Sequence, residues 1–191
     1  MDRTLLSIAI DSSYKENEIK NFLKDLVNIF NIEDRVYSLE KEEDKIPSIV
    51  ISFGELNGEN FSKVHNNINS DFWKSASKKL AKIISKHGKK QDSILIFECN
   101  YKKARGRFTC RTKESKIVKS AINSLESGLI FLIQIFKSED IPSSEIQIYC
   151  GFDERDNEYK IDRAVTFTPE FQEYAYDEAK NKWNKIKIEK D

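Results

Sequence analysis

Clustered and alternating apolar residues along the chain predict seven β-strands. The expected strands cover residues 5–10, 35–41, 48–53, 93–101, 107–112, 145–150 and 159–167. Most of these segments are rich in Ile, Val, Phe or Tyr, and turn-forming Gly, Pro, Asn or Asp residues lie between several of them. This combination is typical of strands.

Four other segments repeat apolar residues with the spacing of one helical face. The expected helices cover residues 14–31 and 59–87, a third stretch from near Glu114 to Phe136, and a last one from Pro169 to Trp183. The third stretch keeps a 4-3-4-3-4 spacing of apolar residues, which favours a helix that runs through Gly128. The alternative ends that helix at Gly128 and makes residues 129–136 a strand, because Ile and Phe favour strands and Gly often follows a helix.

The order of these elements predicts the α+β class: a two-layer protein with a mainly antiparallel sheet and helices on one face. The order is βαββαβ followed by βαββα. The first six elements match the plan of a ferredoxin-like unit, and the rest match a second, incomplete copy. The alternative is one larger antiparallel sheet. Because no Gly/Ser/Pro-rich linker is visible, we expect residues 1–191 to form a single compact domain, with residues 1–101 and 102–191 as candidate sub-units.

The two neighbouring strands of the middle segment predict a hairpin. With a turn centred on Ala104-Arg105, Cys99 faces Cys110 and Glu98 faces Arg111. Both faces are then chemically consistent, as cross-strand pairing requires. The cysteine pair is best interpreted as two small buried side chains, because no CxxC motif or four-ligand zinc set accompanies it.

The remaining chemistry argues against an enzyme of a familiar type. His65 and His87 are about 30 Å apart on one expected helix, and the six glycines form no phosphate-binding loop. No nucleophile elbow, HExxH or catalytic cysteine signature occurs. We therefore assign no catalytic residue, no metal ligand and no cofactor. Three cysteines, no signal peptide and no long apolar run predict a cytoplasmic protein without a membrane partner.

Charge segregation is the unusual feature of the sequence. Residues 1–71 hold 8 basic and 14 acidic side chains, and residues 120–191 hold 9 and 15. Residues 72–119 hold 15 basic and 3 acidic side chains, so the basic charge is concentrated in the middle of a chain whose net charge is zero. Such a segment suits an acidic partner.

The leading hypothesis is a non-enzymatic protein-binding module of the inhibitor, immunity or adaptor type that binds an acidic protein. A Lys/Asn/Ile/Glu-rich composition typical of bacteria or their phages suggests, by analogy alone, a component of a conflict system. The candidate binding residues are Lys74, Lys78, Lys82, Lys102, Lys103, Arg105 and Arg107.

Three alternatives stay open. The basic residues can be a solvated surface that acidic segments of the same chain neutralise. They can bind nucleic acid, where lysine and arginine neutralise phosphates. A metal-dependent nuclease would instead use carboxylates, for which Asp92, Glu98 and Glu114 are the candidates.

Overall fold

A computed structural model describes residues 4–33, 37–39, 46–87, 92–138 and 140–186 of the chain. Its elements, in chain order, are β1 Leu5–Asp11, α1 Glu16–Leu26, β2 Asn31–Ile32, β3 Tyr37–Leu39, β4 Ser48–Glu55, α2 Gly58–Ile68, α3 Asp71–His87, β5 Ser93–Tyr101, β6 Ala104–Thr112, α4 Ser115–Asn123, α5 Leu125–Lys137, β7 Ile146–Asp153, β8 Glu158–Thr166, β9 Gln172–Asp177 and β10 Lys182–Lys185.

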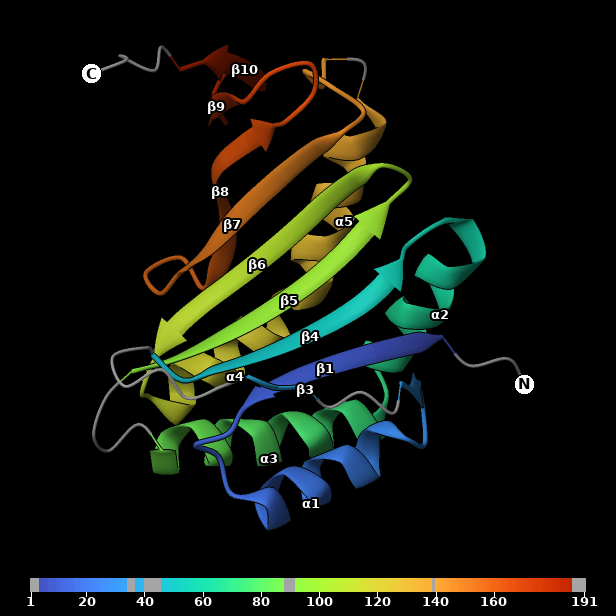
Figure 1. The fold of residues 1–191 in the computed structure, drawn as a ribbon, viewed down its shortest axis with the longest axis vertical. Coiled ribbons are helices and arrows are strands. Elements are labelled where there is room, and N and C mark those ends of the chain that lie inside the picture. The colour runs from blue at the N-terminus through green and yellow to red at the C-terminus, as the bar shows by residue number, and fades with distance from the viewer. Residues whose placement is uncertain (1–3, 34–36, 40–45, 88–91, 139, 187–191) are drawn as a thin grey trace.

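The described strands form one sheet in the order β10-β9-β8-β7-β6-β5-β4-β1-β2, with β3 also pairing with β1 (Figure 1). Besides the parallel pairing of β1 with β2 and with β3, the pairs β4–β5 and β6–β7 are parallel, and in each of these a pair of helices separates the two strands in the chain. The helices α2 and α3 connect β4 to β5, and α4 and α5 connect β6 to β7. Parallel neighbours need such long crossovers, whereas the antiparallel pairs β5–β6 and β7–β8 are joined by tight turns.

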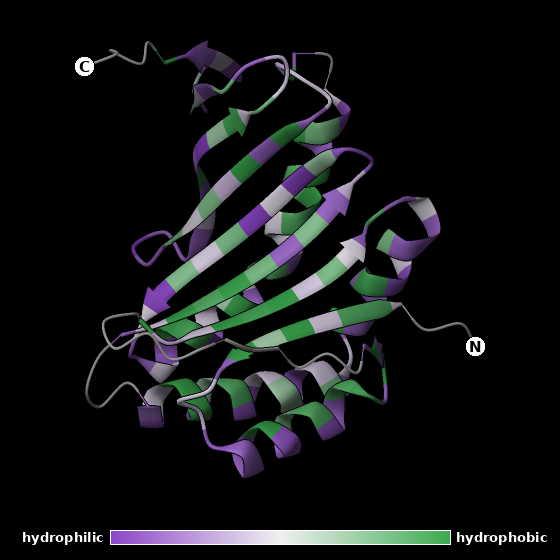
Figure 2. Ribbon diagram, in the orientation of Figure 1, coloured by the Kyte–Doolittle hydropathy of each residue, from purple (hydrophilic) through white to green (hydrophobic). Residues whose placement is uncertain are grey.

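One face of the sheet packs on the helices and carries the core. Along β1, Leu6, Ile8 and Ile10 are buried, while the residues between them are more exposed. The same alternation runs through β4, β6 and β7, as the period of a strand requires. Figure 2 shows that β1, β4 and the first half of β5 are mostly hydrophobic, whereas β6 carries hydrophilic residues along its length. We call the face opposite the helices the outer face.

The α+β class is confirmed, because one large sheet and five helices make up the described chain. The ferredoxin-like order is not confirmed. The sheet runs without interruption from β5 to β6, which is where the sequence suggested a boundary between sub-units. Of the strand expected at residues 35–41, only Tyr37–Leu39 falls within the described residues. No described helix is long and apolar enough to cross a membrane.

Two expected helices are each divided in two. The helix expected at 59–87 breaks after α2, and the Ser70 hydroxyl accepts a hydrogen bond from the Trp73 N–H at 3.2 Å, which caps the start of α3. The helix expected to end at Phe136 breaks at Ser124, whose hydroxyl donates to the carbonyl of Asn157 at 2.6 Å. Residues 129–136 are helical, so the helix interpretation is confirmed and the strand alternative is wrong.

The prediction of a helix from Pro169 to Trp183 is wrong, because this segment forms β9 and β10. Its apolar residues fit a helical wheel, but they also fit a hairpin in which Tyr176 pairs with Trp183, with ring centroids 4.8 Å apart. Aromatic residues favour strands. Asn181, at φ 49°, supplies the left-handed residue that closes the turn.

The expected register of the β5–β6 hairpin is also wrong, although its faces are correct. Tyr101 pairs with Ala104, so the turn is Lys102-Lys103 and each residue of β5 meets a partner different from the expected one. Lys102 has φ 55°, as a tight two-residue hairpin turn requires. Cys99 therefore faces Gly106, and Glu98 faces Arg107.

Candidate protein-binding surface

The seven candidate binding residues lie on two separate parts of the molecule. Lys74, Lys78 and Lys82 are on α3, whereas the other four belong to the turn between β5 and β6 and to the start of β6. Figure 1 shows this hairpin turn at the far end of the sheet from α3. The structure therefore divides the basic middle segment into two surfaces.

Acidic residues of the chain neutralise part of the α3 surface. The Lys74 Nζ lies 3.1 Å from Asp71 Oδ1, and two further lysines of α3 pair with carboxylates of α1: Lys79 with Asp25 at 2.7 Å and Lys86 with Glu18 at 2.6 Å. Lys78 and Lys82 are exposed, and neither forms an ion pair with a described residue. The solvated-surface interpretation fits α3 better than a dedicated site does, because exposed lysines of this kind are common.

On the outer face, one carboxylate lies between two guanidinium groups. The Glu98 side chain of β5 is only 15% exposed, with Arg105 Nη2 3.2 Å from Oε2 and Arg107 Nε 3.5 Å from Oε1. All three side chains point to the outer face because they occupy alternate positions opposite the buried residues of β5 and β6. One carboxylate shared by two arginines leaves one positive charge uncompensated within this group.

This group belongs to a polar row that crosses the sheet. Glu98 pairs with Arg107, Arg107 with Tyr149 of β7, and Tyr149 with Arg163 of β8. The guanidinium carbon of Arg163 lies 5.0 Å from the centroid of the Tyr149 ring, a cation–π contact. Arg163 also pairs with Glu173 at 3.3 Å. The row thus places one aromatic side chain between charged side chains on one surface.

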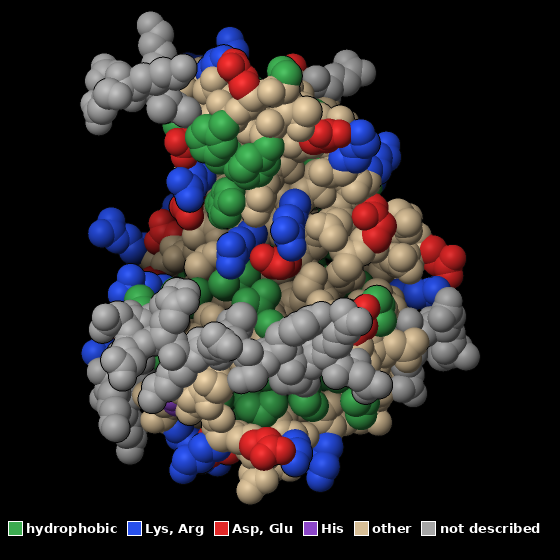
Figure 3. All heavy atoms as spheres, in the orientation of Figure 1, with side chains coloured by type: hydrophobic (Ala, Val, Ile, Leu, Met, Phe, Trp, Pro, Cys, Tyr) green, Lys and Arg blue, Asp and Glu red, His purple; other side chains and the backbone are tan. Residues whose placement is uncertain are grey.

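An exposed aromatic pair begins directly after β8, four residues beyond Arg163. Phe167 and Phe171 are 59% and 52% exposed, and their ring centroids are 5.9 Å apart. Phe167 lines a shallow hollow of about 510 Å³ together with Arg105 and Lys103. Figure 3 looks onto the outer face: basic side chains lie beside an acidic one over β5 and β6, and hydrophobic side chains gather over β7 and β8. We call Arg105, Arg107, Tyr149, Arg163, Phe167 and Phe171 the Arg–Phe surface.

Lys102 and Lys103 lie at the edge of this surface. Lys102 contacts the Tyr101 ring, with its Nζ 5.6 Å from the ring centroid, and its backbone N–H donates to Glu55. Lys103 binds Glu145 at 2.6 Å. Hydrogen bonds from Lys103 and Thr168 hold the pKa of Glu145 below its usual range.

Sequence reasoning missed Tyr149, Arg163, Phe167 and Phe171. Residues 145–150 and 159–167 were correctly expected to be strands, so alternation already placed Tyr149 opposite the buried positions of its strand. The pairing of Arg107 with Tyr149 follows from the parallel β6–β7 register, which the sequence does not specify. Phe171 was assigned to a helix that does not exist.

The described residues contain no group of three or more His, Cys, Asp or Glu side chains arranged to hold a metal ion. Of the three carboxylates considered for a nuclease, Glu98 binds Arg105 and Arg107, and Asp92 binds Arg111 at 3.2 Å.

The three cysteines are free and buried. Burial raises the pKa of Cys99 and of Cys110 to about 12 and also raises the pKa of Cys150. We expect native protein to resist alkylation by iodoacetamide at pH 8 and to react at three thiols after unfolding in urea, as counted by intact mass. Rapid labelling of native protein would contradict this burial.

The same shifts predict a pH dependence of stability. Unfolded thiols ionise near pH 8.5, whereas the native thiols stay protonated until about pH 12. The native state therefore binds more protons in this window, and the free energy of unfolding falls as pH rises through it. The urea concentration at the unfolding midpoint should therefore be lower at pH 10 than at pH 8. A Cys110→Ala variant should show a smaller decrease in this midpoint between the two pH values.

Comparisons with protein-family models, with curated proteins and with solved structures find no match for this chain. The functional argument therefore depends on the geometry of the molecule.

Proposed function

We propose that the protein is a non-enzymatic protein-binding module that binds an acidic partner through the Arg–Phe surface. The observation that carries this proposal is the exposed Phe167–Phe171 pair, in which Phe167 shares a hollow with Arg105, whose neighbour Arg107 binds the same carboxylate. A partner that fits offers a carboxylate next to an apolar side chain.

The composition of the surface supports protein binding. Aromatic residues and arginine are enriched at protein interfaces, and the residues that contribute most binding energy are drawn from them. Two phenylalanines that are each more than half exposed represent apolar area that a partner would remove from water. Arg105 and Arg107 share Glu98, so a partner carboxylate meets a guanidinium without first displacing a one-to-one ion pair.

The competing interpretation is that Arg105, Arg107 and Glu98 only stabilise the hairpin. Exposed ion pairs contribute little, about 0–1 kcal/mol. A purely structural role therefore predicts small changes in stability and no effect on any interaction when the arginines are replaced.

The test uses a photo-crosslinking amino acid, p-benzoylphenylalanine, in place of Phe167. Phe72 of α3, which is 49% exposed, is the matched control position on the other surface. After irradiation in nuclease-treated lysate of the source cell, we expect one discrete protein adduct from position 167 and none from position 72, identified by mass spectrometry.

With the purified partner, Arg105→Glu/Arg107→Glu should lower affinity by about tenfold or more, because like charges now face the partner's carboxylates. Lys78→Glu/Lys82→Glu on α3 is the matched charge reversal and should change affinity little. A partner that crosslinks from position 72 alone, or an affinity that the arginine reversal leaves unchanged, would sink the proposal. Recovery of nucleoprotein only in a parallel lysate without nuclease treatment would favour the nucleic-acid alternative.

A further inference from the structure

A pocket of about 320 Å³ lies on the helix side of the sheet, away from the Arg–Phe surface, between α5 and the strands β8 and β9. Its lining comes from three segments that are distant in sequence. Helix α5 contributes Ser127, Gly128 and Phe131, β8 contributes Glu158 and Tyr159, and β9 and its following turn contribute Tyr176 and Glu178.

Aromatic rings form the walls of this pocket. The centroids of Phe131 and Tyr176 are 6.4 Å apart in an edge-to-face arrangement, and Trp183 packs behind Tyr176. Gly128 lets helix α5 lie close to Tyr159 of β8, because a Cβ at this position would lie 3.3 Å from Tyr159 Cδ2. The pocket is thus held by packed rings and by the helix backbone.

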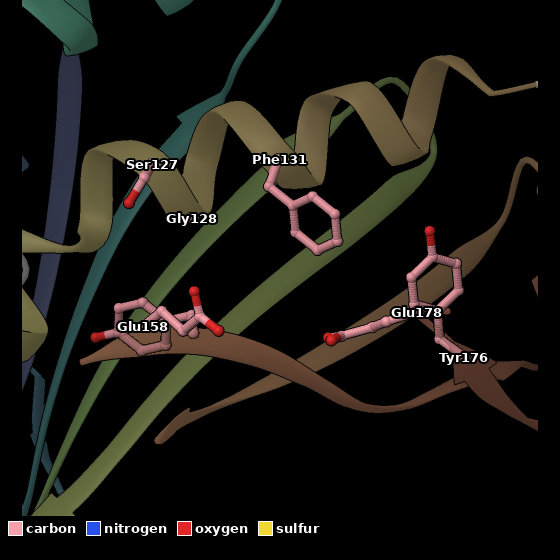
Figure 4. Close-up of a pocket in the computed structure, with 7 residues that line it drawn as sticks. Ser127, Gly128, Phe131, Glu158, Tyr176 and Glu178 are labelled. Carbon is pink, nitrogen blue, oxygen red and sulfur yellow. The ribbon is translucent and has the colours of Figure 1, made fainter. Parts of the chain in front are cut away.

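Two carboxylates face each other across this aromatic space. Figure 4 shows the side chains of Glu158 and Glu178 directed toward one another, with the Phe131 ring reaching down from α5 between them. The Glu178 carboxylate forms no ion pair or hydrogen bond with a described residue, whereas its backbone carbonyl accepts a hydrogen bond from the Asn181 N–H. Glu158 has Lys160 Nζ at 3.8 Å, but that ammonium makes shorter contacts with Asp153, at 3.0 Å, and with Asp156.

We propose that this pocket binds an organic ammonium cation, with the ammonium group between the Glu158 and Glu178 carboxylates and the attached alkyl chain against Phe131 and Tyr176. The faces of aromatic rings attract cations, and their apolar surface suits methylene groups. The volume exceeds what a single ion needs and suits an amine or a lysine side chain.

A bare metal ion fits this pocket less well. Calcium takes six to eight oxygen ligands and magnesium six. The lining residues carry two carboxylates and three hydroxyls, of which the Tyr176 hydroxyl is already hydrogen-bonded to Asn181 and the Ser127 hydroxyl donates to the Ser124 carbonyl. The aromatic walls add nothing to metal binding, whereas they contribute directly to binding an alkylammonium.

The fluorescence of Trp183 can report binding, because Trp183 contacts Tyr176, which lines the pocket. The only other tryptophan, Trp73, is buried in the core among Phe30, Phe53 and Phe97, and gives a constant background. We would titrate the full chain with cadaverine and, separately, with Nα-acetyl-lysine N-methylamide, and record Trp183 fluorescence with calorimetry as a second readout. We expect saturable binding at about millimolar concentration or below.

The variants decide between a site and nonspecific attraction. Glu178→Gln should weaken binding of both probes by about tenfold, because it removes a charged hydrogen-bond acceptor. Glu158→Gln should also weaken it, while Glu33→Gln, which changes an exposed residue directly after β2, should leave it unchanged. The tighter of the two probes identifies whether the natural ligand is a free amine or a lysine of a peptide.

The proposal fails if neither probe saturates, if Glu33→Gln weakens binding as much as Glu178→Gln, or if magnesium chloride at equal ionic strength produces the same Trp183 response. The Arg105→Glu/Arg107→Glu variant should bind the amine normally, so failure here is separate from failure of the proposed protein-binding function.

Discussion

Replacing Phe97 by alanine should lower the free energy of unfolding by about 3–5 kcal/mol, the cost of emptying a large buried site. Phe97 lies in the central strand β5 and is fully buried. Its ring stacks on Phe53 at a centroid distance of 6.2 Å and packs against Trp73 at 6.4 Å. Three elements, β4, β5 and α3, therefore lose contacts together. Urea denaturation followed by circular dichroism measures the change.

Phe72→Ala is the matched control for this substitution. Phe72 lies next to Trp73 on α3 but is about half exposed, so its loss should change the free energy of unfolding by about 0.5 kcal/mol or less. Equal destabilisation by the two variants would contradict the burial of Phe97 in the core and the exposure of Phe72.

Replacing Gly106 by alanine should lower the free energy of unfolding by about 1–3 kcal/mol, the usual cost of overpacking. A Cβ at Gly106 would lie 2.0 Å from Leu132 Cδ2 and 3.1 Å from Cys99 Sγ. Leu132 is itself fully buried, so its side chain cannot move aside freely. Strand β6 would then be pushed away from α5.

Gly106 also links the core to the proposed binding surface, because it separates Arg105 from Arg107 on β6. A displaced β6 should move both guanidinium groups, so Gly106→Ala should weaken partner binding as well as stability. Gly58→Ala is the control: a Cβ there meets nothing within 4 Å, and alanine is the better helix former. It should leave stability unchanged or raise it slightly. A Gly106→Ala variant as stable as wild type would show that Leu132 has room to repack.

The sequence anticipated only part of the Arg–Phe surface and its edge. Lys103, Arg105 and Arg107 were found from charge alone, because a basic segment between two acidic ones is visible without a structure. Their neighbours on the surface were not, since Tyr149 of β7 and Phe167, directly after β8, lie 40 or more residues further along the chain. Charge also grouped the α3 lysines with the hairpin, which lies at the other end of the sheet.

The sequence by itself determined the α+β class and the buried faces of β5 and β6, because both depend on local periodicity and composition. For residues 129–136 the sequence favoured a helix, and the structure decided against the strand alternative. Only the tertiary structure decided the register of the β5–β6 hairpin. The expected and observed registers put the same side chains on the same faces, and a turn at Lys102-Lys103 selects between them. The segment from Pro169 to Trp183 satisfied both a helical and a strand pattern, and pairing with the edge of β8 made it a hairpin. The hairpin register and the helix-or-strand state of the last segment depend on contacts between strands that are distant in sequence. The local pattern of apolar residues does not specify these contacts.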